Sequence, residues 1–311
     1  MPDFQLKTPV AFIIFNRQET TKRVFAEIAK AKPPKLLVIA DGPRASHPDD
    51  VKKCAATREI INSIDWDCEL LTNYSDVNLG CKRRVSSGLD WVFNTVDEAI
   101  ILEDDCLPHP TFFRFCEEML EKYRNDKRIA MISGDNFQFG RKRTAYSYYF
   151  SRYTHIWGWA SWRRTWANYD VEMKLWPEIR NGGWLKDLLE DRKSLWYWRY
   201  IFEKVYKGKI DTWDYQLIFA CWIQSAMAIM PIVNLVSNIG FGQEAVHTTK
   251  ENKFSDMKTE SITFPISHPP YVLRDTVADS ITEKQEYSGK IFSPSAIKNI
   301  ISIIKKLRGL S

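Results

Sequence analysis

The chain has 311 residues, of which 44% are hydrophobic and 27% are charged. This length suits one large α/β domain or two smaller ones, and the apolar share excludes an intrinsically disordered chain. The formal net charge is only +5. So small an excess argues against a strongly basic nucleic-acid-binding protein, and we expect no nucleic acid among its partners.

The excess positive charge is confined to the C-terminus. Five of the 44 basic residues and none of the 39 acidic ones lie in residues 290–311, so the rest of the chain is formally neutral. A helix over residues 295–308 would carry four isoleucines and Leu307 on one face, flanked by lysines. Such a helix suits an anionic membrane surface. Docking on its own domain or on a partner chain explains the pattern equally well.

No membrane-spanning segment and no signal sequence are predicted. No apolar run reaches the ~20 residues that a spanning helix needs. The first eight residues contain Asp3 and a single base, Lys7, unlike the start of a secretory signal. The six cysteines form no CxxC pair, which favours reduced thiols. We therefore expect a cytoplasmic protein, with residues 295–308 as an optional peripheral attachment to the inner face of the membrane.

Strands and helices alternate over the first 135 residues. The expected strands are residues 9–15, 35–40, 68–73, 99–102 and 129–133. The expected helices are residues 20–31, 50–64, 110–123 and one that opens at 78–84. This order indicates the α/β class, with a mostly parallel central sheet flanked by helices and joined by right-handed crossovers.

The composition changes after residue 151, because ten of the 12 tryptophans lie between Trp157 and Trp222. Here the expected elements become less regular. They are a polar loop or helical region around 184–209, a helix over 214–229, a strand over 231–236, a loop over 250–289 and a final helix over 295–308.

Three adjacent acids, Glu103, Asp104 and Asp105, follow the buried strand AIIL directly. The carboxyl ends of the strands are where open α/β sheets bind ligands. Adjacent acids raise one another's pKa unless a cation offsets them, and Mg²⁺ or Mn²⁺ prefers such oxygen ligands. The alternative is a solvated acidic loop.

Charged residues follow two other strands. Asp41 ends the strand VIA in a position that suits a ribose or base contact, although Asp-Gly is also an ordinary turn pair. Lys82, Arg83 and Arg84 lie in the first turn of a helix, where a bound diphosphate would offset their repulsion from the helix dipole. A solvated basic face explains these three bases as well.

Three further features are candidates. The aromatic segment from Trp157 to Trp162 suits sugar binding or simple packing. Asp214, set among aromatic residues, suits a general base or a helix N-cap. His247 suits a metal ligand or an ordinary loop histidine. The chain contains no GxGxxG, GxxxxGK[ST] or GxSxG motif, which disfavours dehydrogenases, P-loop NTPases and serine hydrolases.

The ordered set of motifs is more specific than any one of them. The set is PVAFIIFNR, LLVIADGP, NLGCKRR, AIILEDDCLPHPTFF, ISGDN, WGWASW, TWDYQ and NIGFG. It resembles nucleotide-sugar glycosyltransferases of the GT-A fold, and in particular bacterial relatives of N-acetylglucosaminyltransferase I. The resemblance covers about residues 8–250. It implies a catalytic domain over residues 1–250, with a nucleotide-binding half (8–135) and an acceptor half (136–250), followed by an extension over 251–311.

The resemblance implies roles for individual residues. Asp105 would be the direct ligand of Mn²⁺ or Mg²⁺, with Glu103 and His247 as further metal candidates. Donor-binding roles fall to a larger set: Asn16, Arg17, Asp41, Arg83, Arg84, Asp104 and Trp159. Asp214 would be the base that deprotonates the acceptor hydroxyl, and the anomeric centre would invert. The partners would be a UDP-sugar donor and a glycan or lipid-linked acceptor.

Two other functions fit part of the sequence. A sugar-nucleotide nucleotidyltransferase has a related fold, but it normally begins with a glycine-rich, arginine-containing loop where this chain has FNRQET. A non-catalytic carbohydrate-binding protein fits the aromatic content, but it leaves Glu103, Asp104 and Asp105 without a role.

Overall fold

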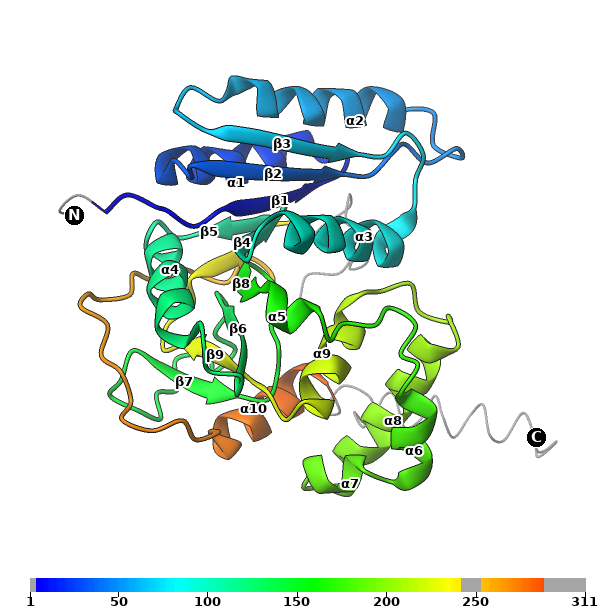
Figure 1. The fold of residues 1–311 in the computed structure, drawn as a ribbon, viewed down its shortest axis with the longest axis vertical. Coiled ribbons are helices and arrows are strands. Elements are labelled where there is room, and N and C mark those ends of the chain that lie inside the picture. Colours follow the sequence, from blue (N-terminus) through cyan, green and yellow to red (C-terminus); the bar gives the residue numbers. More distant parts are fainter. Residues whose placement is uncertain (1–3, 242–252, 288–311) are drawn as a thin grey trace.

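The structure is a computed structural model that describes residues 4–241 and 253–287. Its first part alternates strands and helices, as the sequence predicts. The strands are β1 (Val10–Ile14), β2 (Lys35–Ala40), β3 (Glu69–Tyr74) and β4 (Glu98–Glu103). The intervening helices are α1 (Gln18–Ala31), α2 (Asp50–Glu59), the 3₁₀ turn η1 (Ile60–Ser63) and α3 (Gly80–Thr95). The predicted mostly parallel α/β architecture is thereby confirmed (Figure 1).

The second part of the chain extends the same sheet. Its strands are β5 (Cys106–Pro108), β6 (Ile129–Ser133), β7 (Tyr148–Ser151), β8 (Trp159–Trp162), β9 (Met227–Pro231) and β10 (Val236–Asn238). The eight-stranded sheet has the order β3-β2-β1-β4-β8-β6-β9-β7, and β10 pairs separately with β5. Within the large sheet only β8 and β7 run antiparallel to their neighbours. One sheet therefore runs through both predicted halves.

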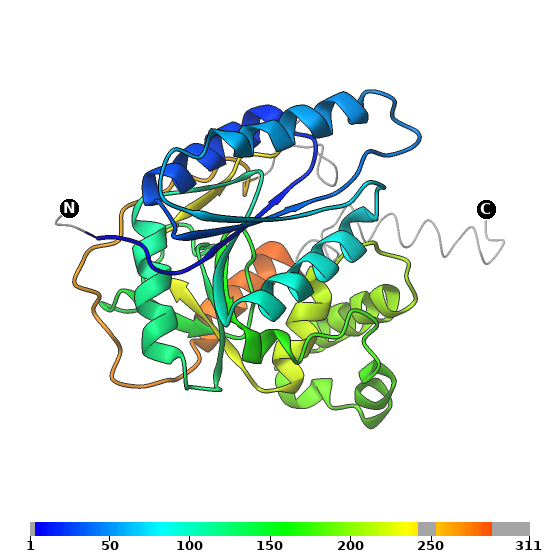
Figure 2. The ribbon, with the colours of Figure 1, turned by 45° about the horizontal axis from the view of Figure 1, so that its top comes forward.

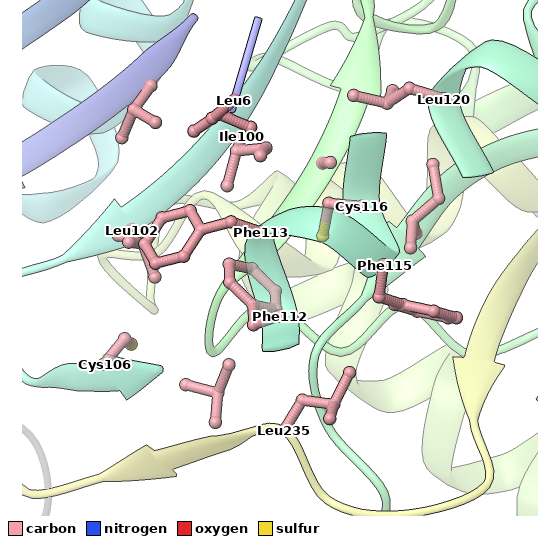
Figure 3. Close-up of a cluster of buried hydrophobic side chains, with 14 of the residues drawn as sticks. Leu6, Ile100, Leu102, Cys106, Phe112, Phe113, Phe115, Cys116, Leu120 and Leu235 are labelled. Atoms are coloured by element: carbon pink, nitrogen blue, oxygen red, sulfur yellow. The ribbon is translucent and has the colours of Figure 1, made fainter. Parts of the chain in front are cut away.

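Two apolar layers cover the faces of this sheet. Val24, Phe25 and Ile28 of α1 pack on one face together with α4 (Thr111–Tyr123). Figure 3 shows Phe113 of α4 beside Leu102 of β4. The opposite face is covered by α3, by the short helix α5 (Arg163–Trp166) and by α9 (Asp214–Ile223), as Figure 2 also shows for α3.

A third, aromatic core holds the helices outside the sheet. These helices are α6 (Trp176–Gly182), α7 (Leu185–Leu188) and α8 (Arg192–Tyr206). Trp176, Trp198 and Trp222 are buried there with Tyr153 and Tyr197. Much of the tryptophan-rich region is therefore packing rather than ligand-binding surface.

Two predictions for the acceptor half were wrong. The predicted helix over 214–229 ends at Ile223, because Ser225 takes a left-handed φ of 53° and the chain turns into β9. The predicted strand over 231–236 falls between β9 and β10, which belong to different sheets.

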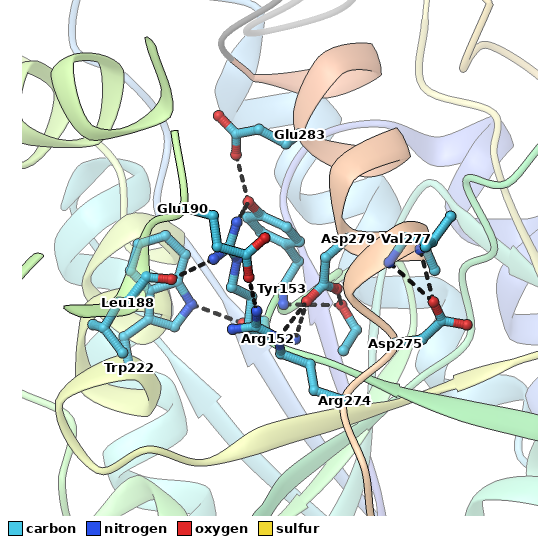
Figure 4. A network of polar contacts seen from close by, with 12 residues as sticks. Arg152, Tyr153, Leu188, Glu190, Trp222, Arg274, Asp275, Val277, Asp279 and Glu283 are labelled. Carbon is cyan, nitrogen blue, oxygen red and sulfur yellow. Dashed lines mark hydrogen bonds and ion pairs between the residues drawn. The ribbon is translucent and has the colours of Figure 1, made fainter. Parts of the chain in front are cut away.

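The predicted loop over 250–289 contains a helix, α10 (Thr276–Glu286). Asp275 caps it by accepting hydrogen bonds from the amides of Val277 and Ala278. Its buried face carries Asp279 and Glu283 (Figure 4), so no apolar periodicity marked it as a helix. Among the helices of residues 4–241 and 253–287, none combines the length and the hydropathy that a membrane-spanning helix needs.

The described part of the C-terminal extension shares the cores of the main body. Ile262 and Ile266 belong to the first core, Ala278 to the second and Tyr287 to the third. The predicted helix over 295–308 lies outside the described residues.

Candidate active site

The site forms where β1 and β4 end side by side. These strands pair in parallel, with Ile13 opposite Glu103, so the residues that follow both strands meet at one edge of the sheet. Arg17 comes from the β1 side, and Asp104 and Asp105 come from the turn between β4 and β5. The predicted ligand-binding edge therefore brings Arg17 together with all three acids.

Arg17 bridges two of these acids. Its Nη2 donates to Asp104 Oδ1 at 2.5 Å, and its Nη1 donates to Asp105 Oδ2 at 2.8 Å. The backbone N–H of Phe15 donates to the other oxygen of Asp104 at 3.1 Å. Burial lowers the pKa of Arg17, but Asp104 and Asp105 raise it more, and the net shift is upward. The guanidinium is therefore a permanent cation between two carboxylates.

The backbone of Gly240 lies directly against this ion pair. A Cβ at residue 240 would lie 2.1 Å from Asp105 Oδ2 and 2.6 Å from Arg17 Nη1. The Ile239 amide donates to the Asp105 carbonyl at 2.8 Å, which extends the β5–β10 pairing to this point. Only glycine lets the chain come so close to both side chains.

The acids exceed the nearby bases. Burial raises the pKa of Glu103, and the charges of Asp105, Asp104 and Asp214 raise it further against the opposing effect of Arg17. Burial likewise raises the pKa of Asp104, which Arg17 opposes. One arginine thus compensates only part of the carboxylate charge, so an added cation would be stabilised here.

A cavity of about 300 Å³ opens beside these residues, a volume within the usual range for small-molecule sites. The polar residues that line it include Arg17, Asp41, Arg44, Asn78, Glu103 and Asp104. Ile13, Ile14 and Val85 supply apolar wall. The cavity therefore combines apolar side chains with charged groups of both signs.

Asp41 is held by its own chain. Its carboxylate accepts from the amides of Gly42 and Leu79 at 2.9 Å, from Gly80 at 3.2 Å and from the Asn78 side chain at 2.9 Å. These donors occupy the roughly four acceptor positions of a carboxylate. The ribose or uracil contact stays a prediction, and it requires one of these bonds to be exchanged.

The first turn of α3 has carboxylate partners within the protein. Asp211 accepts from the Lys82 amide at 3.2 Å, and Glu172 lies 3.4 Å from Lys82 Nζ. Arg84 is buried in the cavity wall and donates to Asn73 Oδ1 at 2.7 Å, whereas Arg83 is exposed and does not line the cavity. The structure therefore brings Arg84, and not Arg83, to the site.

Asn16 and Arg44 meet on Asp50. Asn16 Nδ2 donates to Asp50 Oδ1 at 2.8 Å, and Arg44 Nε donates to Asp50 Oδ2 at 2.6 Å. Arg44 also lies over the Phe15 ring, 5.4 Å from its centroid. Sequence reasoning missed Arg44, although a base just after the Asp-Gly-Pro turn of a buried strand is a readable signal. It also missed Asp211, for which the sequence carries no signal.

Asp214 starts α9 and faces the same acids. Its carboxylate accepts from the Thr212 hydroxyl, and its charge contributes to the raised pKa of Glu103. The thiol of Cys81 marks the meeting point, since burial and then Glu103, Asp214 and Asp211 raise its pKa. Asp214 and Glu103 are thus close enough for their charges to interact.

Trp159 lies within the sheet layer rather than on an open surface. It is 1% exposed, and its ring stacks on Trp213 with centroids 5.9 Å apart. Its Nε1 is buried without a hydrogen-bond partner among the described residues. Trp159 therefore packs against the residue that precedes Asp214. His247 lies outside the described residues.

The residues at the end of β4 fit a hard divalent cation in the type of donor atom that they offer, but not in the number of grouped side chains. Their donors are carboxylate oxygens, which Mg²⁺ and Mn²⁺ prefer. In the described part of the chain, however, no three acidic, histidine or cysteine side chains are grouped to hold a metal. An ion at Asp105 would therefore take most of its ligands from water and substrate phosphates, as Mg²⁺ commonly does.

Comparisons with known proteins supply no family. No family model and no curated protein matches the chain. Among solved structures, it is similar to the mannosyltransferase PcManGT from Pyrobaculum calidifontis in complex with GDP-Man and Mn²⁺ (TM-score 0.37, 14% identity, 52% of this chain covered). That match spans 46% of the mannosyltransferase, less than half of its length.

The chain is also similar to two nucleotide-dependent enzymes. One is the inositol-1-phosphate CTP transferase from T. maritima, with a TM-score of 0.36, 8% identity and coverage of 73% of this chain and 86% of that one. The other is a cytidylyltransferase from Leptospira borgpetersenii, with a TM-score of 0.32, 10% identity and coverage of 56% of this chain and 68% of that one. Similarities at these scores carry no argument about the substrate or the reaction.

Proposed function

We propose that the protein is a divalent-cation-dependent glycosyltransferase of the GT-A type, related to the N-acetylglucosaminyltransferase I family. It transfers a sugar from a nucleotide donor, UDP-linked in our proposal, to a hydroxyl of a glycan or lipid-linked acceptor. The observation that carries the proposal is the cluster of Glu103, Asp104 and Asp105 at the end of β4, beside a cavity of about 300 Å³, with the charge of Asp214 acting on Glu103.

The charge of the site supports a diphosphate bound together with a metal. A diphosphate alone would be repelled by the partly uncompensated carboxylates around Glu103. Asp105 would hold a divalent cation, with Glu103 nearby; a bound cation supplies the charge that stabilises the leaving diphosphate. Arg17 adds a guanidinium fork, which suits phosphate recognition.

The nucleoside would lie in the cavity that Asp41 and the first turns of α3 line together. Ile13, Ile14 and Val85 offer apolar contact, while Arg84 offers hydrogen-bond donors beside them. This division suits a base and ribose, which have apolar faces and polar edges. Asp104, held by Arg17 and the Phe15 amide, would contribute to donor binding from the opposite side.

The chemistry then needs one base. Asp214 removes the proton from the acceptor hydroxyl as the oxygen attacks the anomeric carbon, and the bond from that carbon to the diphosphate breaks. The anomeric centre inverts, and no covalent intermediate with the protein forms. Trp213 and Trp159, stacked on each other, fix the position of Asp214.

A substrate screen tests the reaction class. The full-length protein is incubated with Mn²⁺ and a panel of nucleotide sugars, and the release of nucleoside diphosphate is measured. We expect UDP release from at least one donor and its loss in Asp105→Ala. A parallel panel of sugar phosphates with nucleoside triphosphates detects pyrophosphate. Pyrophosphate release without any nucleoside diphosphate release would replace the proposal by nucleotidyl transfer.

A further inference from the structure

We infer that Arg17 is an internal counter-ion of Asp105, and that it must leave Asp105 before a divalent cation binds there. In consequence, the cation and the donor diphosphate bind cooperatively. The inference rests on the proposed function, because it deepens the role of the same site. It starts from the two short contacts of Arg17, at 2.5 Å to Asp104 and 2.8 Å to Asp105.

The ion pair leaves little room for a second cation on the same oxygen. Asp105 Oδ2 is engaged by Arg17 Nη1 and lies against the backbone of Gly240. The side chains of Arg17 and Asp105 are only 17% and 12% exposed, so water screens their charges weakly. A divalent ion at Asp105 would therefore lie beside a poorly screened guanidinium of like charge.

A donor diphosphate would offer Arg17 an alternative anionic partner to Asp105. Its side chain lines the cavity that would hold the nucleotide, so a short movement brings it to a diphosphate. Arginine binds phosphate oxygens with the same fork that it uses for carboxylates. The diphosphate then compensates Arg17, and Asp105 is released for the cation. By linkage, each ligand strengthens the binding of the other.

The other arginines of the cavity are engaged elsewhere, and Arg44 provides the matched control. Arg44 is bound to Asp50, and Arg84 is bound to Asn73. Arg44→Gln removes one positive charge from the cavity without touching Asp105. A general change in site charge is thereby separated from the release of Asp105 itself.

The test is a titration of the full-length protein with Mn²⁺ in the absence of nucleotide. Electron paramagnetic resonance measures the concentration of free Mn²⁺ at each point. We expect Arg17→Gln to bind Mn²⁺ about tenfold more tightly than the wild type, a factor typical of coupled sites. Arg44→Gln should change the affinity less than about twofold by the same measure. Asp105→Asn should lose the site in both the wild-type and the Arg17→Gln background.

UDP supplies the second arm. It should tighten Mn²⁺ binding to the wild type more than to Arg17→Gln, because that variant has no ion pair to release. Arg17→Lys keeps the charge but not the guanidinium fork, so its Mn²⁺ affinity should lie between those of the wild type and Arg17→Gln. This variant replaces Arg17→Gln in the test if Arg17→Gln does not fold.

The possible outcomes separate the two claims. Unchanged or weaker Mn²⁺ binding by Arg17→Gln, at a site that still requires Asp105, overturns the counter-ion role and leaves the proposed function standing. Equal strengthening by Arg44→Gln also overturns it. If no variant shows an Asp105-dependent Mn²⁺ site, with or without UDP, both claims fail.

Discussion

Trp213 stacks on Trp159 with ring centroids 5.9 Å apart and an interplanar angle of 25°, which ties the start of α9 to β8. β8 lies between β4 and β6 and runs antiparallel to both. The contact therefore connects the central sheet to Asp214, while β4 positions Glu103 from the same sheet. Two segments more than 100 residues apart in the chain meet at the site for this reason.

Replacing Asp214 tests the base directly. Asp214→Asn keeps the size of the side chain but removes its capacity to take a proton, so we expect transfer to fall by roughly 10²–10⁴-fold. Binding of the nucleotide should change little. Asp187→Asn, on the exposed side of α7, is the control and should leave transfer unchanged. Near-normal transfer by Asp214→Asn excludes this residue as the base.

Gly240→Ala tests the close packing over the Arg17–Asp105 pair. The new Cβ would overlap Asp105 Oδ2 at 2.1 Å, so the ion pair must shift. We expect a loss of about 1–3 kcal/mol in stability, together with weaker Mn²⁺ and nucleotide binding measured by calorimetry. Gly208→Ala meets no atom within 4 Å and has a φ of +65°. It should cost about 1 kcal/mol and leave binding intact. Equal effects of the two variants on binding would contradict this picture.

Stability should depend on pH through Glu203. Its pKa is lowered to about 2 by Lys207, Trp176 and Arg180. A lowered pKa means that the stabilisation is present above the ordinary pKa of 4.5 and is lost as the pH falls through about 2. Glu203→Gln should therefore cost about 1 kcal/mol at pH 7. Urea unfolding should show this difference shrinking between pH 4.5 and pH 2; a difference independent of pH would rule out the ionic contribution.

Glu283 tests the attachment of α10. Its Oε2 accepts from the Tyr153 hydroxyl at 2.5 Å and from Trp198 Nε1 at 2.9 Å (Figure 4 shows the first contact). Glu283→Ala leaves two buried donors unpaired, at about 3 kcal/mol. Lys284→Ala, on the exposed side of the same helix, should change stability by less than about 0.5 kcal/mol. Thermal unfolding measures both, and equal melting temperatures would show that the network contributes nothing to stability.

The first part of the chain was predictable because β1, β2 and β4 are nearly continuous apolar runs. Sequences such as VAFII and AIILE bury nearly every side chain, and this pattern indicates parallel strands without reference to the rest of the chain. Since the carboxyl ends of such strands share one edge, the sequence predicted Asp104 and Asp105 at the ligand-binding edge, whereas their pairing with Arg17 came from the structure alone.

The remainder depends on contacts that no local pattern records. α10 buries Asp279 and Glu283, so its inward face is acidic and lacks apolar periodicity. Asp41 lies at the edge of the sheet where it was predicted. Its carboxylate, however, already accepts hydrogen bonds from the amides of Leu79 and Gly80, which belong to a segment about 38 residues further along the chain. Arg83 and Arg84 are adjacent in sequence. Which of them is buried depends on the face that α3 turns toward the protein, and that face carries Arg84.

The most direct measurement of the central claim is calorimetric binding of UDP, GDP, CDP and dTDP to the full-length protein, with Mn²⁺ and with EDTA. We predict that one nucleotide, UDP by our proposal, binds in the presence of Mn²⁺ and binds at least tenfold more weakly in EDTA, a difference of about 1.4 kcal/mol. Asp105→Asn should remove this difference. Binding that is equal in Mn²⁺ and EDTA, or no binding of any of the four, would contradict this prediction.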